Sequence, residues 1–335
     1  MKRICALTLV SLLSTSCLAQ QHPGAEEFAA KAAAEYQLDS AQIMQLLHDA
    51  RFKQSIVDAI SRPAEAKPWY EYRPIFITEK RIRGGVDFWR ENEALVRQAS
   101  ERFGVDPQII VAIIGVETFY GRITGSYRVL DALTTLSFYY PDTGNDRSDF
   151  FSRELMQFFA LGSEEGLPLR EVTGSYAGAM GLGQFMPSSY REYAVDLDGD
   201  GRRDLWSSMS DVIGSVANYL GRHGWQDGQP VTYPAVVAAD ADLSLVARSD
   251  FKPKLTLDEL GAAGFALRLP TAAGETAAAT AGDSPAAVAR LEEKDGGSYW
   301  ITFDNFYVIT RYNRRPLYAM AVYERSEAIR AGFAH

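Results

Sequence analysis

Residues 106–117 constrain the fold most, because they predict a helix that has to lie in the interior. Asp106-Pro107 is typical of a helix start, with an N-cap residue followed by proline at the first helical position. Residues 109–116 are then apolar on nearly every face of a helix. Such a helix needs other elements packed all round it, and Glu117 stands at its end.

The spacing of apolar residues predicts a mainly α (α+β) protein. Helices are expected over residues 26–61, 86–103, 132–139, 148–161, 188–195, 212–222 and 318–330. The prolines at 63, 68 and 74 predict an extended connection after the first helix. Short strands or loops are expected over 231–247 and 263–269, and a strand over 299–310. Residues 271–289, rich in Ala, Gly, Ser and Thr, are expected to form a flexible insert.

Residues 1–19 predict a secretory signal. A short basic start precedes an apolar run over 4–13, which is too short to span a bilayer, and small residues follow it. Cleavage after Ala19 would release a soluble periplasmic protein. Alternatively, residues 13–17 (LSTSC) resemble a lipobox, and Cys17 would then carry a lipid anchor. No later stretch approaches the length of a membrane-spanning helix.

The composition excludes several kinds of site. Cys5 and Cys17 are the only cysteines, so the mature chain has no disulfide and no thiolate for catalysis or zinc. Loss of the two positive charges in the signal moves the net charge from −9 to −11. Nucleic acid is therefore not an expected partner, because binding phosphates requires a basic surface.

Glu117 is the first candidate for chemistry. A carboxylate at the end of an apolar helix loses hydration, which raises its pKa. A raised pKa lets a carboxylic acid keep, at neutral pH, the proton that a general acid donates to a glycosidic oxygen. Taken by position alone, a solvent-facing glutamate where the helix reaches the surface is the more ordinary interpretation.

Residues 174–190 (GSYAGAMGLGQFMPSSY) are the second candidate. Their glycines allow the backbone to approach a ligand closely. Ser175 and Gln184 offer neutral hydrogen-bonding groups that suit the amides and hydroxyls of a sugar. On its own, the segment fits a tight turn that packs two helices slightly better than it fits a binding loop.

Together the two segments resemble the lytic transglycosylase B family (glycoside hydrolase family 103), which cleaves peptidoglycan between N-acetylmuramic acid and N-acetylglucosamine. The likeness runs from about Trp69 to the C-terminus and includes residues 130–133 (LDAL), 214–219 (GSVANY) and 309–313 (ITRYN). It implies a lysozyme-like helical core over 86–230, preceded by a helical region over 20–85. A small β-containing subdomain over 231–310 and a C-terminal segment over 311–335, which returns to the core, would follow.

The resemblance implies that Glu117 is the only catalytic residue. It would protonate the leaving oxygen and then take a proton from the muramyl C6 hydroxyl, which attacks C1 to give a 1,6-anhydromuramyl end without water. The family positions that contact substrate match Ser175, Met180, Gln184, Tyr219, Tyr312, Asn313 and Tyr318. Taken singly, a tyrosine is more often a core residue than a sugar platform. Family members can carry arginines after the proline that matches Pro141. This chain has an acidic loop over 142–147 instead, with Arg147 as the remaining basic candidate.

Residues 196–204 (DLDGDGRRD) predict a calcium loop. Asp196, Asp198 and Asp200 stand at positions 1, 3 and 5 of an EF-hand pattern, with the Arg202 carbonyl at position 7. Position 12 is serine rather than the usual glutamate. The resemblance implies a longer loop, over 196–211, that a later acid closes, and Asp211 is the matching residue. We expect structural Ca²⁺ and no organic cofactor; the alternative is a plain turn.

Two other functions stay open. A hydrolytic muramidase, with Asp131 or another acid assisting Glu117, would give reducing ends that are heavier than anhydro ends by one water. A non-catalytic wall-binding protein would sediment with purified sacculi and release no fragments. The expected partner is peptidoglycan in each case, with cell-wall synthases as further candidates, and the chain is expected to be a monomer.

Overall fold

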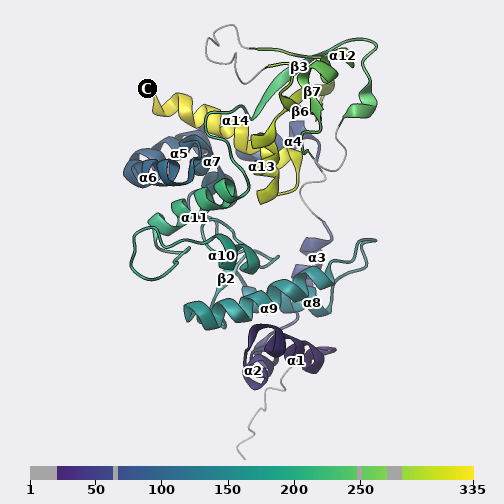
Figure 1. The fold of residues 1–335 in the computed structure, drawn as a ribbon. Helices are drawn as coiled ribbons and strands as arrows, with labels where there is room; N and C mark the ends of the chain where they lie inside the picture. Colours follow the sequence, from purple (N-terminus) through teal and green to yellow (C-terminus); the bar gives the residue numbers. More distant parts are fainter. Residues whose placement is uncertain (1–20, 63–66, 247–250, 270–280) are drawn as a thin grey trace, which may run out of the picture.

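The computed structural model of the chain describes residues 21–62, 67–246, 251–269 and 281–335. The described residues are mainly helical, with a five-stranded and a two-stranded antiparallel sheet (Figure 1). The predicted class, mainly α with a small β-containing part, is confirmed. The predicted signal over 1–19 and residues 271–280 of the expected insert lie outside the described residues. No helix within the described ranges is long and apolar enough to cross a membrane.

The helices are α1 (Ala25–Tyr36), α2 (Ser40–Asp49), α3 (Gln54–Ile60), α4 (Trp69–Phe76), α5 (Glu79–Glu91), α6 (Glu93–Phe103), α7 (Pro107–Thr118), α8 (Val129–Phe138), α9 (Ser148–Glu165), α10 (Pro187–Tyr193), α11 (Met209–Arg222), α12 (Leu257–Ala262), α13 (Asp304–Tyr312) and α14 (Pro316–Phe333). The strands are β1 (Tyr127–Arg128), β2 (Thr173–Gly174), β3 (Thr232–Val237), β4 (Leu255–Thr256), β5 (Phe265–Leu267), β6 (Pro285–Glu293) and β7 (Gly296–Thr302).

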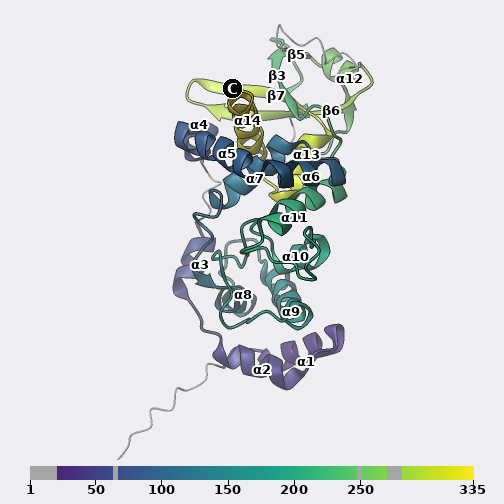
Figure 2. The same ribbon diagram turned by 90° about the vertical axis from the view of Figure 1, so that its left-hand side faces the viewer.

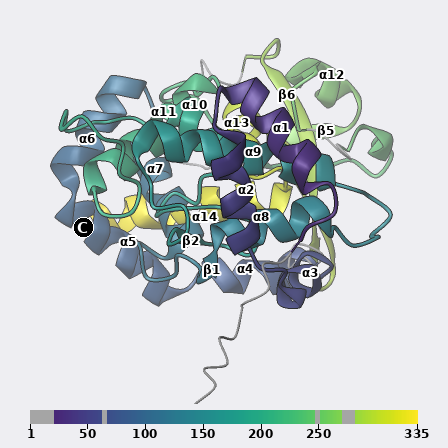
Figure 3. The same ribbon diagram turned by 90° about the horizontal axis from the view of Figure 1, so that it is seen from below.

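The elements form successive layers along one long axis (Figure 2). Helices α1 and α2 lie at one end and cover α8 and α9, as the view along the axis also shows (Figure 3). Helices α10 and α11 follow, and then α5, α6, α7, α13 and α14. The sheet, in the order β4-β6-β7-β3-β5, lies at the other end. It has its own small apolar core, built around Leu260, Phe265, Val288 and Ile301.

Helix α7 is the buried helix that the sequence predicts. Its residues 109–116 are all buried, and α5, α6, α11 and α14 pack against it. Burying each of its isoleucine and valine side chains stabilises the fold by about 1.5–3 kcal/mol. Asp106 does stand at the N-cap position, but its carboxylate makes no capping bond. It accepts instead from the Trp225 indole N–H at 2.8 Å.

The predictions for the N-terminal third are wrong in detail. The single helix over 26–61 is three helices, α1, α2 and α3. Gln37 ends α1 in the left-handed region, and the Asp39 carboxylate caps α2 by accepting from the Ala41 N–H. The expected extended connection contains α4, because Trp69 and Tyr72, three residues apart, bury one helical face. The helix over 86–103 is two helices that meet at Asn92.

Two segments of the C-terminal half also differ from the predictions. The strand expected over 299–310 ends at Thr302, where α13 follows. Its buried Asn305, Phe306, Val308 and Ile309 have the spacing of a helix face. Within the segment predicted as a flexible insert, residues 285–289 belong to β6; residues 285–286 pair with β4 and residues 287–289 with β7. The sequence analysis missed this strand because the segment is rich in alanine, which does not favour strands. Its Ala286 and Val288 face the small core.

Gly125 allows the chain to pass closely beside β2, and this close approach is testable. Its φ is +86°, and a Cβ at this position would lie 2.1 Å from the Gly174 carbonyl oxygen. Gly125→Ala should therefore lower the free energy of unfolding by at least about 3 kcal/mol in urea denaturation. Gly104→Ala is the control, because Gly104 has φ +63° with nothing within 4 Å of a Cβ, and should cost about 1–2 kcal/mol. Equal losses for the two variants would contradict the close approach.

Candidate active site

Glu117 lies in the last turn of α7, where the helix leaves the core. The side chain is partly buried, and its Oε1 accepts a hydrogen bond from the Tyr318 hydroxyl of α14 at 2.5 Å. Loss of hydration raises the pKa of Glu117 to about 7, and the hydrogen bond from Tyr318 partly opposes that rise. The carboxyl group therefore holds its proton in a large fraction of molecules at neutral pH.

Tyrosines from three helices form a series of ring contacts that begins at this carboxyl group. The Tyr318 and Tyr312 rings are stacked, with centroids 6.5 Å apart, and the Tyr219 ring of α11 lies 4.7 Å from the Tyr312 ring. Their hydroxyls have different acceptors. Tyr219 donates to the Arg311 carbonyl and Tyr312 to the Gly183 carbonyl, so only Tyr318 of these three donates to Glu117. Asn313 directly follows Tyr312 at the end of α13.

The glycine-rich segment 174–185 forms a folded-back loop beside α7. Met180 and Phe185 exchange backbone hydrogen bonds of 2.8 and 2.9 Å, and Gln184 adopts a φ of +51°. The loop is bound to the helix that carries Glu117, since the Thr118 hydroxyl donates to the Leu182 carbonyl at 3.0 Å. The Tyr312 bond to Gly183 ties the loop to α13.

The predicted loop residues differ in what their side chains do. The Gln184 amide donates to the carbonyls of Thr124 and Gly181, which fixes it beside the turn that follows Glu117. The Ser175 hydroxyl accepts from the backbone N–H groups of its own turn. The Met180 side chain is fully buried. The structure thus links Glu117 directly to Tyr318, and through ring contacts to Tyr312 and then Tyr219.

The turn after Glu117 contains residues that the sequence analysis missed. Phe119 and Tyr120 have φ values of 50° and 58°, a left-handed conformation that costs non-glycine residues about 1–2 kcal/mol each. The guanidinium groups of Arg81 and Arg122 lie 4.6 and 4.7 Å from the centroid of the Phe119 ring. Two consecutive aromatic residues in this conformation give no signal in a single sequence, because glycine or asparagine is the usual cue.

Asp131, the residue proposed as a second acid in the hydrolytic alternative, has a structural role. It is buried in α8, and its Oδ1 accepts from the Arg51 backbone N–H at 2.8 Å and from the guanidinium of Arg128. These bonds fasten the N-terminal helices to α8. Burial and the Tyr318 hydroxyl account for the pKa of Glu117, with no contribution from a neighbouring carboxylate among the described residues.

The loop between α10 and α11 gathers carboxylates as predicted. One oxygen each from Asp196, Asp198 and Asp211 lies within 4.8 Å of the others, a donor set that suits a hard cation such as Ca²⁺. Asp211 is buried and accepts from the backbone N–H groups of Leu197 and Asp204, which draws both ends of the loop onto α11. Asp200, also predicted, lies outside this group and accepts from the Arg202 N–H.

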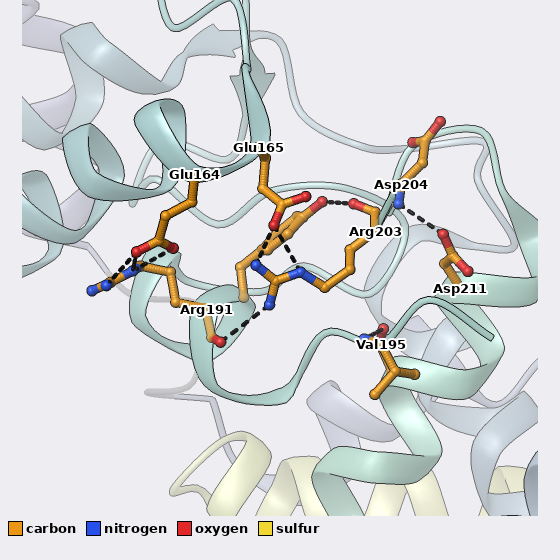
Figure 4. Close-up of polar contacts among 9 residues, drawn as sticks. Glu164, Glu165, Arg191, Val195, Arg203, Asp204 and Asp211 are labelled. Carbon is orange, nitrogen blue, oxygen red and sulfur yellow. Dashed lines mark hydrogen bonds and ion pairs between the residues drawn. The ribbon is translucent and has the colours of Figure 1, made fainter. Parts of the chain in front are cut away.

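Ion pairs fasten this loop to the end of α9 (Figure 4). Arg203 donates to the Glu165 carboxylate and, at 3.2 Å, to the Arg191 carbonyl. Arg191 in turn donates to the Glu164 carboxylate. These ion pairs hold the loop against the end of α9. Arg147, the basic candidate of the acidic loop, is exposed, and its guanidinium lies 4.7 Å from the Phe150 ring centroid.

Comparison with known proteins decides the family. The model of the transglycosylase SLT domain matches residues 20–327. The chain is 40% identical over 318 residues to the membrane-bound lytic murein transglycosylase B of Escherichia coli (strain K12), covering 92% of this chain and 83% of that protein. The chain belongs to the lytic murein transglycosylase B family. It is an enzyme that acts on peptidoglycan.

Solved structures of family members have the same fold. The soluble lytic transglycosylase SltB1 from Pseudomonas aeruginosa superposes with a TM-score of 0.83 and 46% identity, over 93% of this chain and all of that one. The Escherichia coli transglycosylase Slt35 in complex with calcium superposes with a TM-score of 0.79 and 38% identity, over 94% of this chain and 95% of that one. The matches to SltB1 and Slt35 therefore extend over nearly the whole of this chain.

The Tyr318 hydrogen bond predicts a pH effect. It favours the ionised form of Glu117, so Tyr318→Phe should raise the pKa of the carboxyl group. An acid acts only while protonated, so activity falls as pH rises through this pKa near 7, and the variant should keep its activity to higher pH. The measurement is the pH profile of kcat/KM for release of soluble glycan from sacculi. Tyr219→Phe is the control: it removes a hydroxyl that is bonded to the Arg311 carbonyl, so the pH at which kcat/KM falls should not change. A fall of kcat/KM at lower pH in Tyr318→Phe than in the wild type would contradict this prediction.

Proposed function

We propose that the enzyme cleaves the MurNAc-β-1,4-GlcNAc bond without water and leaves 1,6-anhydromuramyl ends, with Glu117 acting first as acid and then as base. The observation that carries this proposal is a carboxyl group with a pKa near 7, to which no second carboxylate among the described residues contributes. Hydrolysis by a glycosidase needs a second carboxylate as nucleophile or base, and Asp131 is committed to Arg128 and the Arg51 backbone. A hydrolytic role for Asp131 therefore has no support.

The proton moves through Glu117 in both steps. The neutral carboxyl group gives its proton to the glycosidic oxygen as the bond from that oxygen to C1 breaks. The resulting carboxylate then takes the proton of the muramyl C6 hydroxyl while O6 bonds to C1. Glu117 ends the cycle protonated, so no water is consumed. Burial favours the neutral starting form, and the Tyr318 hydroxyl stabilises the carboxylate that exists between the two steps.

The residues around Glu117 would bind the glycan strand. The tyrosine rings offer flat faces for sugar rings. Gln184 offers its amide oxygen, since its NH2 group donates to the Thr124 and Gly181 carbonyls. Residues proposed to contact substrate are Ser175, Met180, Gln184, Tyr219, Tyr312, Asn313 and Tyr318. The buried position of Met180 supports a role in shaping the loop, while its proposed contact with a bound strand rests on its match to the family position. We place this activity in the periplasm.

The catalytic assignment is tested by Glu117→Gln. The amide has no proton to donate at neutral pH, so release of soluble muropeptides from sacculi should fall by at least about 10³-fold. Glu154→Gln is the matched control. Glu154 is a buried glutamate whose pKa is also raised by burial, but its carboxylate accepts from Ser188 at the start of α10. It should keep wild-type activity per folded molecule. Full activity of the Glu117 variant would overturn the assignment.

We also propose that Ca²⁺ binds the loop over 196–211 and stabilises it. Asp196, Asp198, Asp211 and, after a small movement, Asp200 would supply carboxylate oxygens, and Arg202 its carbonyl. The clustered carboxylates support this, and Slt35 has been crystallised with calcium. A cation here would relieve repulsion between the acids and join α10 to α11.

Calcium at about 100 times its dissociation constant should stabilise the fold by about 2.7 kcal/mol, measured as the difference in unfolding free energy between calcium and chelator. Asp198→Asn should abolish that difference. Asp204→Asn is the control, because Asp204 accepts from Trp206 and Ser207 and lies outside the carboxylate group, and it should retain the difference. Wild-type protein with equal stability in both conditions would refute the calcium proposal.

A further inference from the structure

Arg325 of α14 is a fully buried arginine without an acidic partner. None of the ion pairs between described residues includes it, and its Nε has no hydrogen-bond partner among them. A buried charge of this kind lowers stability unless other polar groups compensate it. Arg325 is compensated by two backbone carbonyls and one tyrosine hydroxyl. One carbonyl and the tyrosine belong to residues just before and just after Glu117.

The contacts of Arg325 join three elements at the end of α7. Nη1 donates to the Gly115 carbonyl at 3.0 Å, two residues before Glu117. Nη2 donates to the Arg81 carbonyl of α5 at 3.0 Å and to the Tyr120 hydroxyl at 3.1 Å, three residues after Glu117. The carbonyls at a helix C-terminus carry partial negative charge, so a cation is favoured at this position.

Tyr120 fits into space that two glycines leave free. A Cβ at Gly115 or at Gly85 would lie 2.4 Å from the Tyr120 hydroxyl oxygen. The Arg325 guanidinium lies 5.2 Å from the centre of the Tyr120 ring as well as on its hydroxyl. The left-handed conformation of Tyr120 is therefore held from both sides, by the glycines of α5 and α7 and by Arg325.

The same helix carries the partner of Glu117. Tyr318 and Arg325 are seven residues apart, which is about two turns and roughly 10 Å along α14. Helix α14 thus attaches to the end of α7 at two points, through the Gly115 carbonyl and through the Glu117 carboxyl group. The first contact joins the planar guanidinium group of Arg325 to the backbone of α7. It therefore fixes α14 relative to α7, and this in turn sets where the Tyr318 hydroxyl meets Glu117.

We propose that Arg325 is a positioning residue for the acid step, with Tyr120 as its counterpart: the guanidinium fixes the last turn of α7 relative to α14 and so holds the Glu117 carboxyl group on the Tyr318 hydroxyl. This inference rests on the proposed role of Glu117. Arg325 itself touches neither Glu117 nor the substrate; it acts through the geometry of the Glu117–Tyr318 pair.

The test is a double-mutant cycle between Arg325→Lys and Tyr318→Phe. Lysine keeps the charge but not the fork, so kcat for muropeptide release, per folded molecule, should fall about tenfold or more with KM within about twofold of wild type. In the Tyr318→Phe background the same change should lower kcat by less than about threefold, because the contact that Arg325 positions is already absent. Leu155→Ala, a buried change in α9, controls for lost stability and should not change kcat.

Unchanged kcat in Arg325→Lys, or equal fold-losses in both backgrounds, would overturn the inference and leave Arg325 a purely structural residue. If the lysine variant does not fold, Tyr120→Phe takes its place, since it removes only the hydroxyl that Arg325 holds, and the same criteria decide. Glu117→Gln separates the two proposals. An active Glu117→Gln enzyme refutes the proposed function, whereas an inactive one beside an unaffected Arg325→Lys enzyme refutes positioning alone.

Discussion

The contact between α7 and α14 at Glu117 is the interaction on which the site depends. Burial of α7 removes water from the carboxyl group at its end, and the Tyr318 hydroxyl replaces part of that hydration at 2.5 Å. The first effect favours the neutral acid and the second the carboxylate. Burial is the larger effect and raises the pKa of Glu117 to about 7, so both protonation states are populated at neutral pH. One group is therefore able both to give and to take a proton under the same conditions.

The remaining elements hold Glu117 and the residues around it in position. The glycine-rich loop is bound to α7 through Thr118 and to α13 through Tyr312, so the proposed binding surface and the acid share one framework. The acidic loop over 196–211 fastens α11, which carries Tyr219, to the end of α9. Asp131 is committed to joining α8 to the N-terminal helices. Asp131 and the carboxylates of this loop thus have structural partners, whereas the Glu117 carboxyl group is bonded to the Tyr318 hydroxyl of the proposed site.

The features predicted correctly are those that a single segment encodes. Residues 106–117 predicted the buried helix and its terminal carboxyl group, because a helix that is apolar on nearly every face has to lie in the interior. The alternate aspartates of 196–200 predicted two members of the acidic cluster, Asp196 and Asp198, whereas Asp200 lies outside it and Asp211 was implied by the family resemblance. The strand expected over 299–310 became α13 beyond Thr302, because short apolar runs fit both periods and tertiary packing decides between them. Arg325 could not be predicted, since an arginine in an amphipathic helix normally faces solvent, and its carbonyl partners come from α5 and α7.

A single carboxyl group is proposed to cleave the glycan without water, and the origin of the product oxygen tests this most directly. Sacculi would be digested by the wild-type enzyme in H₂¹⁸O and the muramyl ends analysed by mass spectrometry. With the proposed mechanism, we expect anhydromuramyl ends, which are lighter than reducing ends by one water and free of ¹⁸O. Reducing ends that carry ¹⁸O at C1 would show that water attacks, and would contradict the central claim.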